Sequence, residues 1–310
     1  MKAHAILMEQ PKALKFRALS LVEPTEGDVV VSVRQSGIST GTERLLWSGE
    51  MPPFPGMGYP LVPGYETIGE VVATTTADLP VGTSVFVPGA QCFTEARGLF
   101  GGAASQLVVP AHRLHALPDG LGEQGVLLAL AATARHALAG SEKLPEVIVG
   151  HGVLGRLIAR IATEMGHAPL VWETNPDRHG GAHGYQVIDP VEDDRKDYAA
   201  IMDVSGDAGI LDTLFSHLQP GGEVTLAGFY ADRLSFDFPT AFMREARMRI
   251  AAEWKPDDMA AVTRMVADGR LDLSGLITHR AQPQEAETAY RTAFEDPACL
   301  KMILDWRSFS

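Results

Sequence analysis

Cysteine is scarce in this chain, which has 310 residues and only two thiols, Cys92 and Cys299. Two thiols cannot build a disulfide scaffold or a four-cysteine structural zinc site. Basic residues are also in deficit, because 26 Lys and Arg stand against 39 Asp and Glu and give a formal net charge of −13. With no basic stripe to offset the repulsion of phosphates, nucleic acid is excluded as a partner.

Long apolar runs are absent as well. A transmembrane helix needs about 20 apolar residues, whereas the longest run here extends only from Val126 to Ala134. Residues 1–4 lead directly into alternating strand-like sequence, so we expect no signal peptide. What remains is a balance of 45% apolar and 21% charged residues. This balance is typical of a soluble, cytoplasmic α/β protein with one large or two medium domains.

The chain has two parts that differ in their sequence pattern. Residues 1–120 contain short β-branched runs separated by Gly and Pro, which predicts an antiparallel β-domain of barrel type. Residues 121–262 alternate strand with helix, which predicts a doubly wound parallel sheet covered by helices. Residues 263–310 return to a mixed pattern. The expected strands are 29–33, 68–73, 84–87 and 106–109 in the first part, and 147–149, 170–173, 186–188, 201–204 and 223–227 in the second.

A glycine-rich motif follows the first strand of the second part. Gly150, Gly152 and Gly155 form the pattern G-x-G-x-x-G between that strand and an expected helix. The first glycine allows a tight turn, the second lets the backbone approach a pyrophosphate, and the third lets the helix pack on the sheet. Backbone amides at the helix start, including those of Val153 and Leu154, would then hold the phosphates. The motif predicts a dinucleotide site, the alternative being a set of turn glycines.

A carboxylate at the end of the second strand favours NAD as the cofactor. Glu173 lies 18 residues after the motif, where an acidic side chain binds ribose hydroxyls and repels the 2′-phosphate of NADP. Arg178 lies nearby, so the alternative that Glu173 only caps a loop stays open. Ser205 follows the fourth strand, and Gly228 and Phe229 follow the fifth, where open sheets bind ligands. We expect Phe229 either beside the nicotinamide or in the core.

Several short motifs that point to the same superfamily are spread along nearly the whole chain. They lie at residues 36–43, 63–71, 81–85, 117–120, 221–228 and 276–279. Together they resemble the medium-chain dehydrogenase/reductase superfamily. The resemblance implies a GroES-like β-barrel catalytic domain into which a Rossmann cofactor domain is inserted. It therefore implies a catalytic and substrate domain of residues 1–120 and 263–310, a dinucleotide-binding domain of residues 121–262, and a homodimer.

The zinc-binding positions of that superfamily carry other residues here. Zinc-dependent members use a Cys, a His and a later acid or Cys. The corresponding residues of this chain are Ser39 or Thr40, because one extra residue makes the alignment ambiguous, followed by Tyr65 and Ala129. Hydroxyls and a methyl group are poor zinc ligands. The resemblance thus implies a member without a metal.

An alcohol oxidation without zinc needs another acceptor for the hydroxyl proton. We expect Tyr65 to hydrogen-bond the substrate oxygen and to relay its proton through Ser39 or Thr42. A Tyr side chain has a pKa of about 10, so Tyr65 needs a lowered pKa to act as a base and otherwise acts as a donor. Thr40 and Glu66 complete the candidate catalytic group, with Glu66 orienting backbone or cofactor. The alternative is that Tyr65 only fills the vacated zinc cavity.

A closer resemblance is carried by the tract 36–43, the short loop around Cys92 and the ending 290–306. These segments are similar to a subfamily that works late in bacteriochlorophyll synthesis. That subfamily oxidises the 3-(1-hydroxyethyl) group of a bacteriochlorophyllide to an acetyl group with NAD+. The resemblance implies a tetrapyrrole substrate and leaves open a peripheral association with the photosynthetic membrane.

An aromatic stretch rich in Gly and Pro is the candidate wall for a flat macrocycle. It contains Trp47, Phe54 and Tyr59, and large aromatic side chains commonly line apolar ligand sites. Aromatic residues beside Pro also anchor loops, which is the alternative interpretation.

Two other functions remain as alternatives. One is a zinc-free quinone or enoyl reductase of the same superfamily that uses NADPH, which Glu173 disfavours because such enzymes usually present basic or hydroxyl residues to the 2′-phosphate. The other is a non-catalytic NAD-binding protein that lost its chemistry together with zinc. Turnover measurements distinguish all three.

Overall fold

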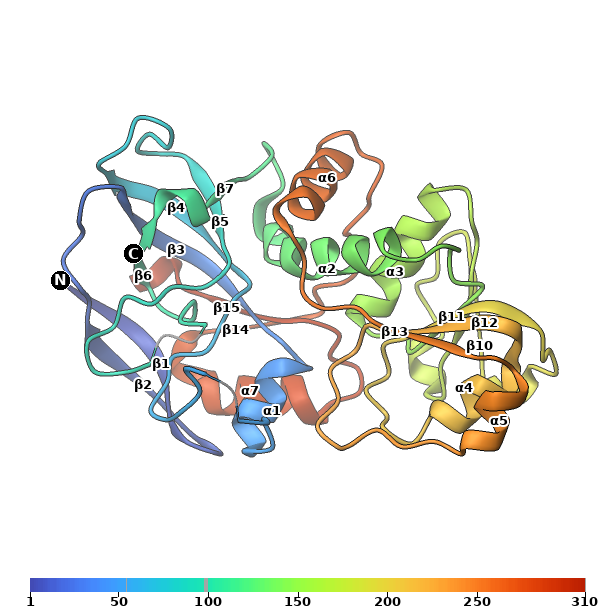
Figure 1. The fold of residues 1–310 in the computed structure, drawn as a ribbon. Helices are drawn as coiled ribbons and strands as arrows, with labels where there is room; N and C mark the ends of the chain where they lie inside the picture. The colour runs from blue at the N-terminus through green and yellow to red at the C-terminus, as the bar shows by residue number, and fades with distance from the viewer. Residues whose placement is uncertain (54, 98–99, 310) are drawn as a thin grey trace. The chain divides into compact units, whose positions relative to one another are not determined.

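The fold divides into two compact units. The computed structural model of the chain describes residues 1–53, 55–97 and 100–309. Unit 1 contains Met1–Ala129 and Leu276–Ser310, and unit 2 contains Leu130–Gly275 (Figure 1). Both ends of the chain therefore belong to unit 1, and unit 2 is inserted between them.

Unit 1 is built on a mostly antiparallel sheet. Its strands are β1 (Lys2–Gln10), β2 (Ala13–Ser20), β3 (Asp28–Ile38), β4 (Thr67–Thr74), β5 (Ser84–Val87), β6 (Gln106–Pro110), β7 (His115–Ala116), β14 (His279–Ala281) and β15 (Met302–Asp305). The order is β14-β15-β3-β4-β5-β7, and β1 and β2 form a separate hairpin. The long strand β3 pairs with β4 on one side and with β6 and then β15 on the other. Pairing with β15 joins the end of the chain to its first third.

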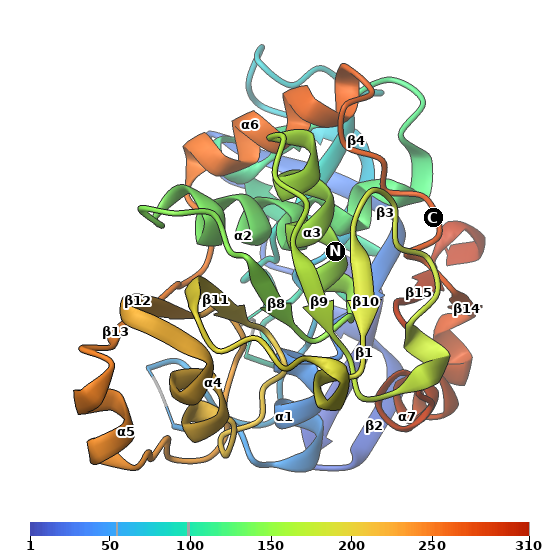
Figure 2. The same cartoon turned by 90° about the vertical axis from the view of Figure 1, so that its right-hand side faces the viewer.

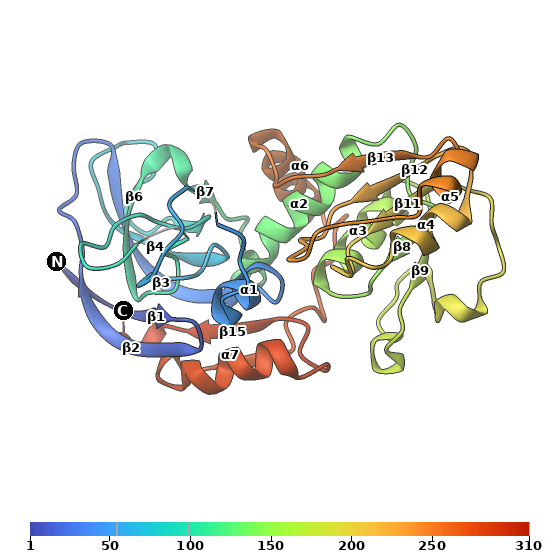
Figure 3. The ribbon, with the colours of Figure 1, turned by 60° about the horizontal axis from the view of Figure 1, so that its bottom comes forward.

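A large cluster of buried apolar side chains forms much of the core of unit 1. It draws Ile6, Val31, Leu107 and Leu304 from four different strands, as expected when β-branched and aliphatic residues leave water on folding. Two helices complete the unit, α1 (Thr42–Ser48) and α7 (Ala286–Glu295). Figure 3 shows α7 alongside β15 and the β1–β2 hairpin. The C-terminal segment thus covers part of the N-terminal sheet.

Unit 2 is a parallel sheet with helices. Its strands are β8 (Val147–Val149), β9 (Leu170–Trp172), β10 (Gln186–Ile188), β11 (Tyr198–Asp203), β12 (Leu218–Leu226) and β13 (Arg247–Ile250). They follow the order β10-β9-β8-β11-β12-β13, and every pair is parallel (Figure 2). The order reverses between β8 and β11. In such sheets ligands bind beyond the carboxyl ends of the strands at this switch point.

Five helices accompany the sheet of unit 2. They are α2 (Leu128–Ala139), α3 (Val153–Glu164), α4 (Leu211–His217), α5 (Phe238–Met243) and α6 (Pro256–Ala267). α2 and α6 lie side by side (Figures 2 and 3), where Nδ1 of His136 donates a 2.8 Å hydrogen bond to Asp258. Among the described residues, no helix has the length and apolar character that a membrane crossing requires.

The unit boundaries differ in position from those expected from the sequence. The expected boundaries were 120/121 and 262/263, whereas the units meet at 129/130 and 275/276. At the first boundary, a 3-10 turn over Gly122–Leu127 packs on β3 and β4, which keeps it in unit 1. At the second, α6 continues past residue 262 and stays whole in unit 2.

Candidate active site

The glycine-rich loop lies at the carboxyl edge of the parallel sheet. Gly150 has a φ of +99°, a region that favours glycine. A Cβ on Gly155 would lie 1.9 Å from the carbonyl oxygen of Gly150, whereas a Cβ on Gly152 would meet no atom within 4 Å. The second position therefore leaves open space for a pyrophosphate. Val153 and Leu154 begin α3, which has no side-chain cap, so its first N–H groups suit phosphate oxygens. These residues fit a dinucleotide.

Glu173 follows β9 directly and is buried. Its Oε2 accepts a 3.0 Å hydrogen bond from the backbone N–H of His151, and its Oε1 accepts one of 2.9 Å from that of Asn175. Each carboxylate oxygen keeps a second lone pair, which a ribose hydroxyl can use. The two backbone hydrogen bonds therefore hold the carboxylate in place at the end of β9.

The ends of β11 and β12 lie beside the glycine-rich loop. A Cβ on Gly150 would be 3.3 Å from Cα of Ser205, and a Cβ on Gly228 would be 3.3 Å from Cα of Val204. Ser205 is exposed, and its backbone N–H donates to Asp203 at 3.1 Å. Phe229 is 50% exposed. The core position considered for Phe229 is therefore wrong, because half of this residue is exposed, and a place beside the nicotinamide remains a prediction.

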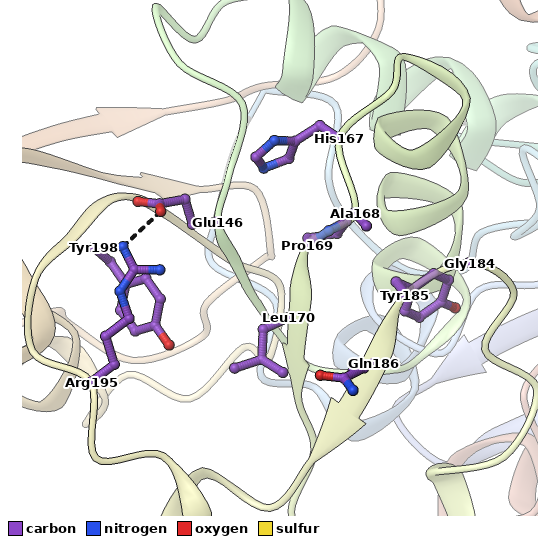
Figure 4. A pocket seen from close by; sticks show the side chains of 10 residues that line it. All are labelled: Glu146, His167, Ala168, Pro169, Leu170, Gly184, Tyr185, Gln186, Arg195 and Tyr198. Carbon is purple, nitrogen blue, oxygen red and sulfur yellow. Dashed lines mark hydrogen bonds and ion pairs between the residues drawn. The ribbon is translucent and has the colours of Figure 1, made fainter.

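A hollow of about 550 Å³ opens at the other edge of this sheet. It is lined by residues at or just before the starts of the strands, including Glu146, Gln186 and Tyr198 (Figure 4). Arg195 donates a 2.8 Å hydrogen bond to Glu146 across it. Parallel strands begin at one edge and end at the other. The hollow is therefore separate from the candidate nucleotide site.

Three hydroxyl groups meet in unit 1 at the start of α1. The hydroxyl of Tyr65 lies 2.6 Å from Oγ of Ser39 and 3.5 Å from Oγ1 of Thr42. Ser39 and Thr40 were the two candidates for the position of the first zinc ligand. Ser39 is the one that hydrogen-bonds Tyr65, and Thr40 lies half-buried beside it. Tyr65 itself is partly exposed. We call Ser39, Thr42 and Tyr65 the hydroxyl cluster.

Tyr65 is a hydrogen-bond donor rather than a free base. Burial, and next the negative charge of Glu66, raise the pKa of Tyr65. Hydrogen bonds with Ser39 and Thr42 lower this pKa, but their effect is smaller than that of burial and of Glu66. A phenol with a raised pKa does not ionise near neutral pH, although it can pass a proton along a hydrogen-bonded chain.

Glu66 lies behind the hydroxyl cluster in a buried ion pair. Nζ of Lys301 donates to Oε2 of Glu66 at 2.6 Å and to the carbonyl oxygen of Ile38 at 3.1 Å. Both charged side chains are almost completely buried. Within the described part of the chain, Oε1 of Glu66 has no hydrogen-bond partner. The pair therefore holds the strand end that leads into Ser39.

Glu43 is a second buried carboxyl group beside the hydroxyl cluster. It accepts hydrogen bonds from the backbone N–H of Ser39 at 3.3 Å and from the hydroxyl of Tyr290 at 3.0 Å. Burial, and next the charge of Glu66, raise the pKa of Glu43 to about 8. Glu43 is therefore mostly protonated at neutral pH, and the charge of Lys301 balances that of Glu66.

Known proteins match this architecture over the full chain. The model of the alcohol dehydrogenase GroES-like domain matches residues 25–119. The 2-desacetyl-2-hydroxyethyl bacteriochlorophyllide A dehydrogenase of Rhodobacter capsulatus is 56% identical over 311 residues, covering 99% of each chain. This chain belongs to the bacteriochlorophyllide dehydrogenase family. The protein of the same name from Cereibacter sphaeroides is 54% identical over 316 residues, again covering 99% of each.

The chain has the fold of solved alcohol dehydrogenases. The structure of an alcohol dehydrogenase from Escherichia coli CFT073, solved with NADH, gives a TM-score of 0.83. It is 20% identical and covers 98% of this chain and 99% of that chain. At this identity the likeness concerns the fold alone. The GroES-like domain with a Rossmann domain, expected from the sequence, is confirmed.

The positions that bind zinc in other medium-chain dehydrogenases do not suit zinc in this family member. Ser39 and Tyr65 offer hydroxyl groups, which bind zinc well only when deprotonated, and the raised pKa of Tyr65 opposes this. Ala129 offers a buried methyl group. In the described ranges, no group of three or more His, Cys, Asp and Glu can hold a metal ion. We therefore derive no step through zinc.

The aromatic residues expected as a substrate wall have contacts within unit 1. The rings of Trp47 and Phe294 are 5.5 Å apart, and the hydroxyl of Tyr59 donates to the backbone carbonyl of Leu46. Phe54 lies outside the described residues. Trp47 and Tyr59 therefore make the contacts expected of residues that anchor a loop. Their contact with the substrate remains a prediction.

Three residues of these sites were not singled out from the sequence. They are His151, Tyr290 and Lys301, and each acts through a contact with a distant segment. For Tyr290 and Lys301 the available signal was the resemblance, which lies in both the tract 36–43 and the ending 290–306. His151 lies in neither segment, and its signal was its place within the glycine-rich motif. Pairing of β3 with β15 brings these two segments together, so that their polar residues meet.

Proposed function

We propose that this chain oxidises the hydroxyethyl side chain of a bacteriochlorophyllide, at position 3 of the macrocycle, to an acetyl group with NAD+ and without catalytic zinc. The observation that carries the proposal is its identity, over the full length, with relatives named for a hydroxyethyl bacteriochlorophyllide. The hydroxyl cluster supports it, because the oxygen of a reacting alcohol needs hydrogen-bonding partners. The step lies late in bacteriochlorophyll a biosynthesis.

The reaction removes a hydride from the carbinol carbon and a proton from the hydroxyl group, leaving a ketone. The chemistry that NAD+ supplies when bound is acceptance of the hydride. We assign the proton to the hydroxyl cluster. The alcohol gives its proton to Tyr65 while Tyr65 passes its own to Ser39 or Thr42, and that residue gives its own hydroxyl proton to water in the same step. Because these transfers occur together, no free phenolate forms, in keeping with the raised pKa of Tyr65.

Glu66 and Thr40 have supporting roles in this proposal. The backbone carbonyl of Glu66 accepts a 2.7 Å hydrogen bond from the N–H of Gly37, and its side chain holds Lys301. Both contacts support the strand end before Ser39, so Glu66 orients the backbone. Thr40 lies next to the cluster without being assigned a proton.

We propose NAD+ rather than NADP+ as the cofactor. The buried carboxylate of Glu173 supports this choice, because its two backbone hydrogen bonds prevent it from turning away from a 2′-phosphate. The glycine-rich loop, with Val153 and Leu154, would hold the pyrophosphate. Ser205, Gly228 and Phe229 would lie on the nicotinamide side, as the edge of the sheet suggests.

Anaerobic turnover of 3-(1-hydroxyethyl) bacteriochlorophyllide a with NAD+ or NADP+, followed by the pigment spectrum, tests the proposal. We expect the acetyl product with NAD+, at a rate that a chelator does not change. Loss of activity with chelator would contradict the zinc-free part. Reduction of quinones or enoyl compounds with NADPH in place of pigment oxidation would support the reductase alternative. NAD+ binding without any turnover would support the non-catalytic one.

We also propose a homodimer formed through β13. This strand ends the sheet order, and Ile250 on it is 64% exposed. The neighbouring α5 exposes Phe238 and Phe242, each by 65%. A strand edge beside exposed apolar side chains favours pairing with a second copy. Light scattering should give a dimer for the wild type and a monomer for Ile250→Asp, whereas a wild-type monomer would contradict the proposal.

We place the reaction in the cytoplasm, at the surface of the photosynthetic membrane. NAD+ is dissolved in water, whereas the macrocycle of the pigment is apolar and partitions into lipid. Flotation of the chain with anionic liposomes, with and without pigment, measures this association. Flotation only when pigment is present would indicate that the substrate brings the enzyme to the surface.

A further inference from the structure

His151 is a fully buried residue between the first two glycines of the glycine-rich loop. Its backbone N–H donates to Glu173 at 3.0 Å, and its backbone carbonyl accepts a 3.0 Å hydrogen bond from Nε of Arg156. Its Nδ1 lies 2.6 Å from the carbonyl oxygen of Arg178, and its Nε2 lies 2.9 Å from the hydroxyl of Tyr185. This one residue joins the loop to α3, to the end of β9 and to the two segments that follow.

These partners determine which ring nitrogen of His151 carries the proton. A carbonyl oxygen only accepts, so Nδ1 is the nitrogen that donates to Arg178. Burial lowers the pKa of His151 to about 4, so the ring is neutral and Nε2 accepts from Tyr185. Burial also raises the pKa of Tyr185, which keeps its hydroxyl a donor. Each backbone and ring polar group of His151 therefore has a hydrogen-bond partner, and these partners are compatible with one orientation of the ring.

Arg156 supports the same contact from α3. This side chain is buried, and its second guanidinium nitrogen donates to the carbonyl oxygen of Arg178 at 2.9 Å. The segment from Glu173 to Arg178 is thus held against the glycine-rich loop by two side chains. If the segment moved, the Glu173 carboxylate would move with it.

We propose that His151 is a positioning residue for the adenosine half of the dinucleotide. It keeps the Glu173 carboxylate at a constant place relative to the glycine-rich loop, so that ribose hydroxyls and pyrophosphate are bound at the same time. It also prevents the carboxylate from making room for a 2′-phosphate. The inference rests on the NAD+ part of the proposed function and concerns affinity and selectivity, not the chemical step.

Calorimetric binding of NAD+ and NADP+ tests this role. In His151→Phe the NAD+ affinity should fall about tenfold, and in Tyr185→Phe it should fall severalfold. The NADP+ affinity should change less, so the preference for NAD+ narrows in both variants. Tyr198→Phe is the matched control, because it loses a buried 2.7 Å hydrogen bond to Asp193 at the other edge of the same sheet. Its NAD+ affinity should equal that of the wild type.

Nitrogen-15 NMR of labelled histidine supplies a second readout. The His151 signal, identified by its loss in His151→Phe, should be that of a neutral ring protonated at Nδ1, and should persist to about pH 5. A ring protonated at Nε2, or NAD+ affinity in His151→Phe within about twofold of the wild type, would overturn the inference. If His151→Phe does not fold, unchanged affinity and selectivity in Tyr185→Phe would overturn it equally.

The binding measurements use no pigment, so they separate this inference from the proposed reaction. A wild-type chain that binds NAD+ but does not oxidise the pigment would refute the reaction and leave the role of His151 standing. Failure of the wild-type chain to bind NAD+ would overturn both.

Discussion

The hydroxyl of Tyr290 donates a 3.0 Å hydrogen bond to the carboxyl group of Glu43, although 247 positions separate the two residues in the chain. Both side chains are fully buried. The bond joins α7, in the returning C-terminal segment, to the first turn of α1. The position of the hydroxyl cluster therefore depends on residues that follow the whole of unit 2 in the sequence.

Replacing Tyr65 by Phe removes the hydroxyl that would connect the substrate oxygen to Ser39. We expect pigment turnover at saturating NAD+ to fall at least about tenfold, with NAD+ affinity unchanged. Single-turnover kinetics followed by the pigment spectrum measure the effect. Tyr198→Phe, which loses a buried hydroxyl in unit 2, should keep the wild-type rate. Unchanged turnover in Tyr65→Phe would favour the alternative that Tyr65 only fills the former zinc cavity.

The carboxyl group of Glu43 should make stability depend on pH. Its pKa is about 8 in the folded chain and about 4.3 in an unfolded one, so between these values the folded state holds a proton that the unfolded state releases. The free energy of unfolding should therefore decrease as pH rises from about 4.3 to 8, by at most about 1.4 kcal/mol per pH unit. The contribution of Glu43 to the free energy of unfolding is therefore full below the unfolded pKa of about 4.3 and is lost above the folded pKa of about 8.

Denaturant unfolding at several pH values, with Glu43→Gln beside the wild type, measures this contribution. The variant keeps a neutral acceptor for Tyr290 and should show a flatter dependence on pH. Glu9→Gln, which removes one partner of the Lys15–Glu9 surface pair, is the control and should follow the wild type. Parallel curves for wild type and Glu43→Gln would mean that Glu43 is ionised throughout this range.

Removal of Lys301 leaves the buried Glu66 without its partner. Lys301→Met should lower the free energy of unfolding by about 3–5 kcal/mol, and adding Glu66→Gln should restore a large part of it. Lys15→Met, at an exposed pair, should change it by less than about 1 kcal/mol. A loss for Lys301→Met as small as that of Lys15→Met would show that Glu66 is neutral or solvated in the folded chain.

Substitution of Glu173 by Gln removes the negative charge at the ribose site and keeps the size of the side chain. The ratio of NADP+ to NAD+ affinity should rise about tenfold, because a 2′-phosphate no longer meets a carboxylate. Calorimetry with both dinucleotides measures the ratio, and Glu192→Gln, an exposed residue of the same unit, is the control. An unchanged ratio would mean that other residues near the expected ribose site, such as Arg178 in the turn after β9, set the cofactor selectivity.

Much of the fold follows from local patterns. Alternation of short strands and helices predicted the parallel sheet, and the spacing of Gly150, Gly152 and Gly155 predicted the loop between β8 and α3, because each glycine answers a local steric demand. The position of Phe229 could not be decided in this way. An aromatic residue after a strand is equally compatible with the core and with a ligand edge, and the exposure that excludes the core exists only in the folded chain.

The linear sequence is enough to predict the chemistry available to this protein: a glycine-rich loop followed by a carboxylate, and hydroxyl groups where related enzymes carry zinc ligands. These are properties of residue type and spacing, which local sequence contains. Folding was needed to show that Ser39 rather than Thr40 bonds Tyr65, that Glu43 is mostly protonated near pH 7 beside the Glu66–Lys301 pair, and that His151 contacts the segment after β9 from the glycine-rich loop. Protonation depends on burial and on charges brought from distant segments, and those distances exist only after the chain has folded.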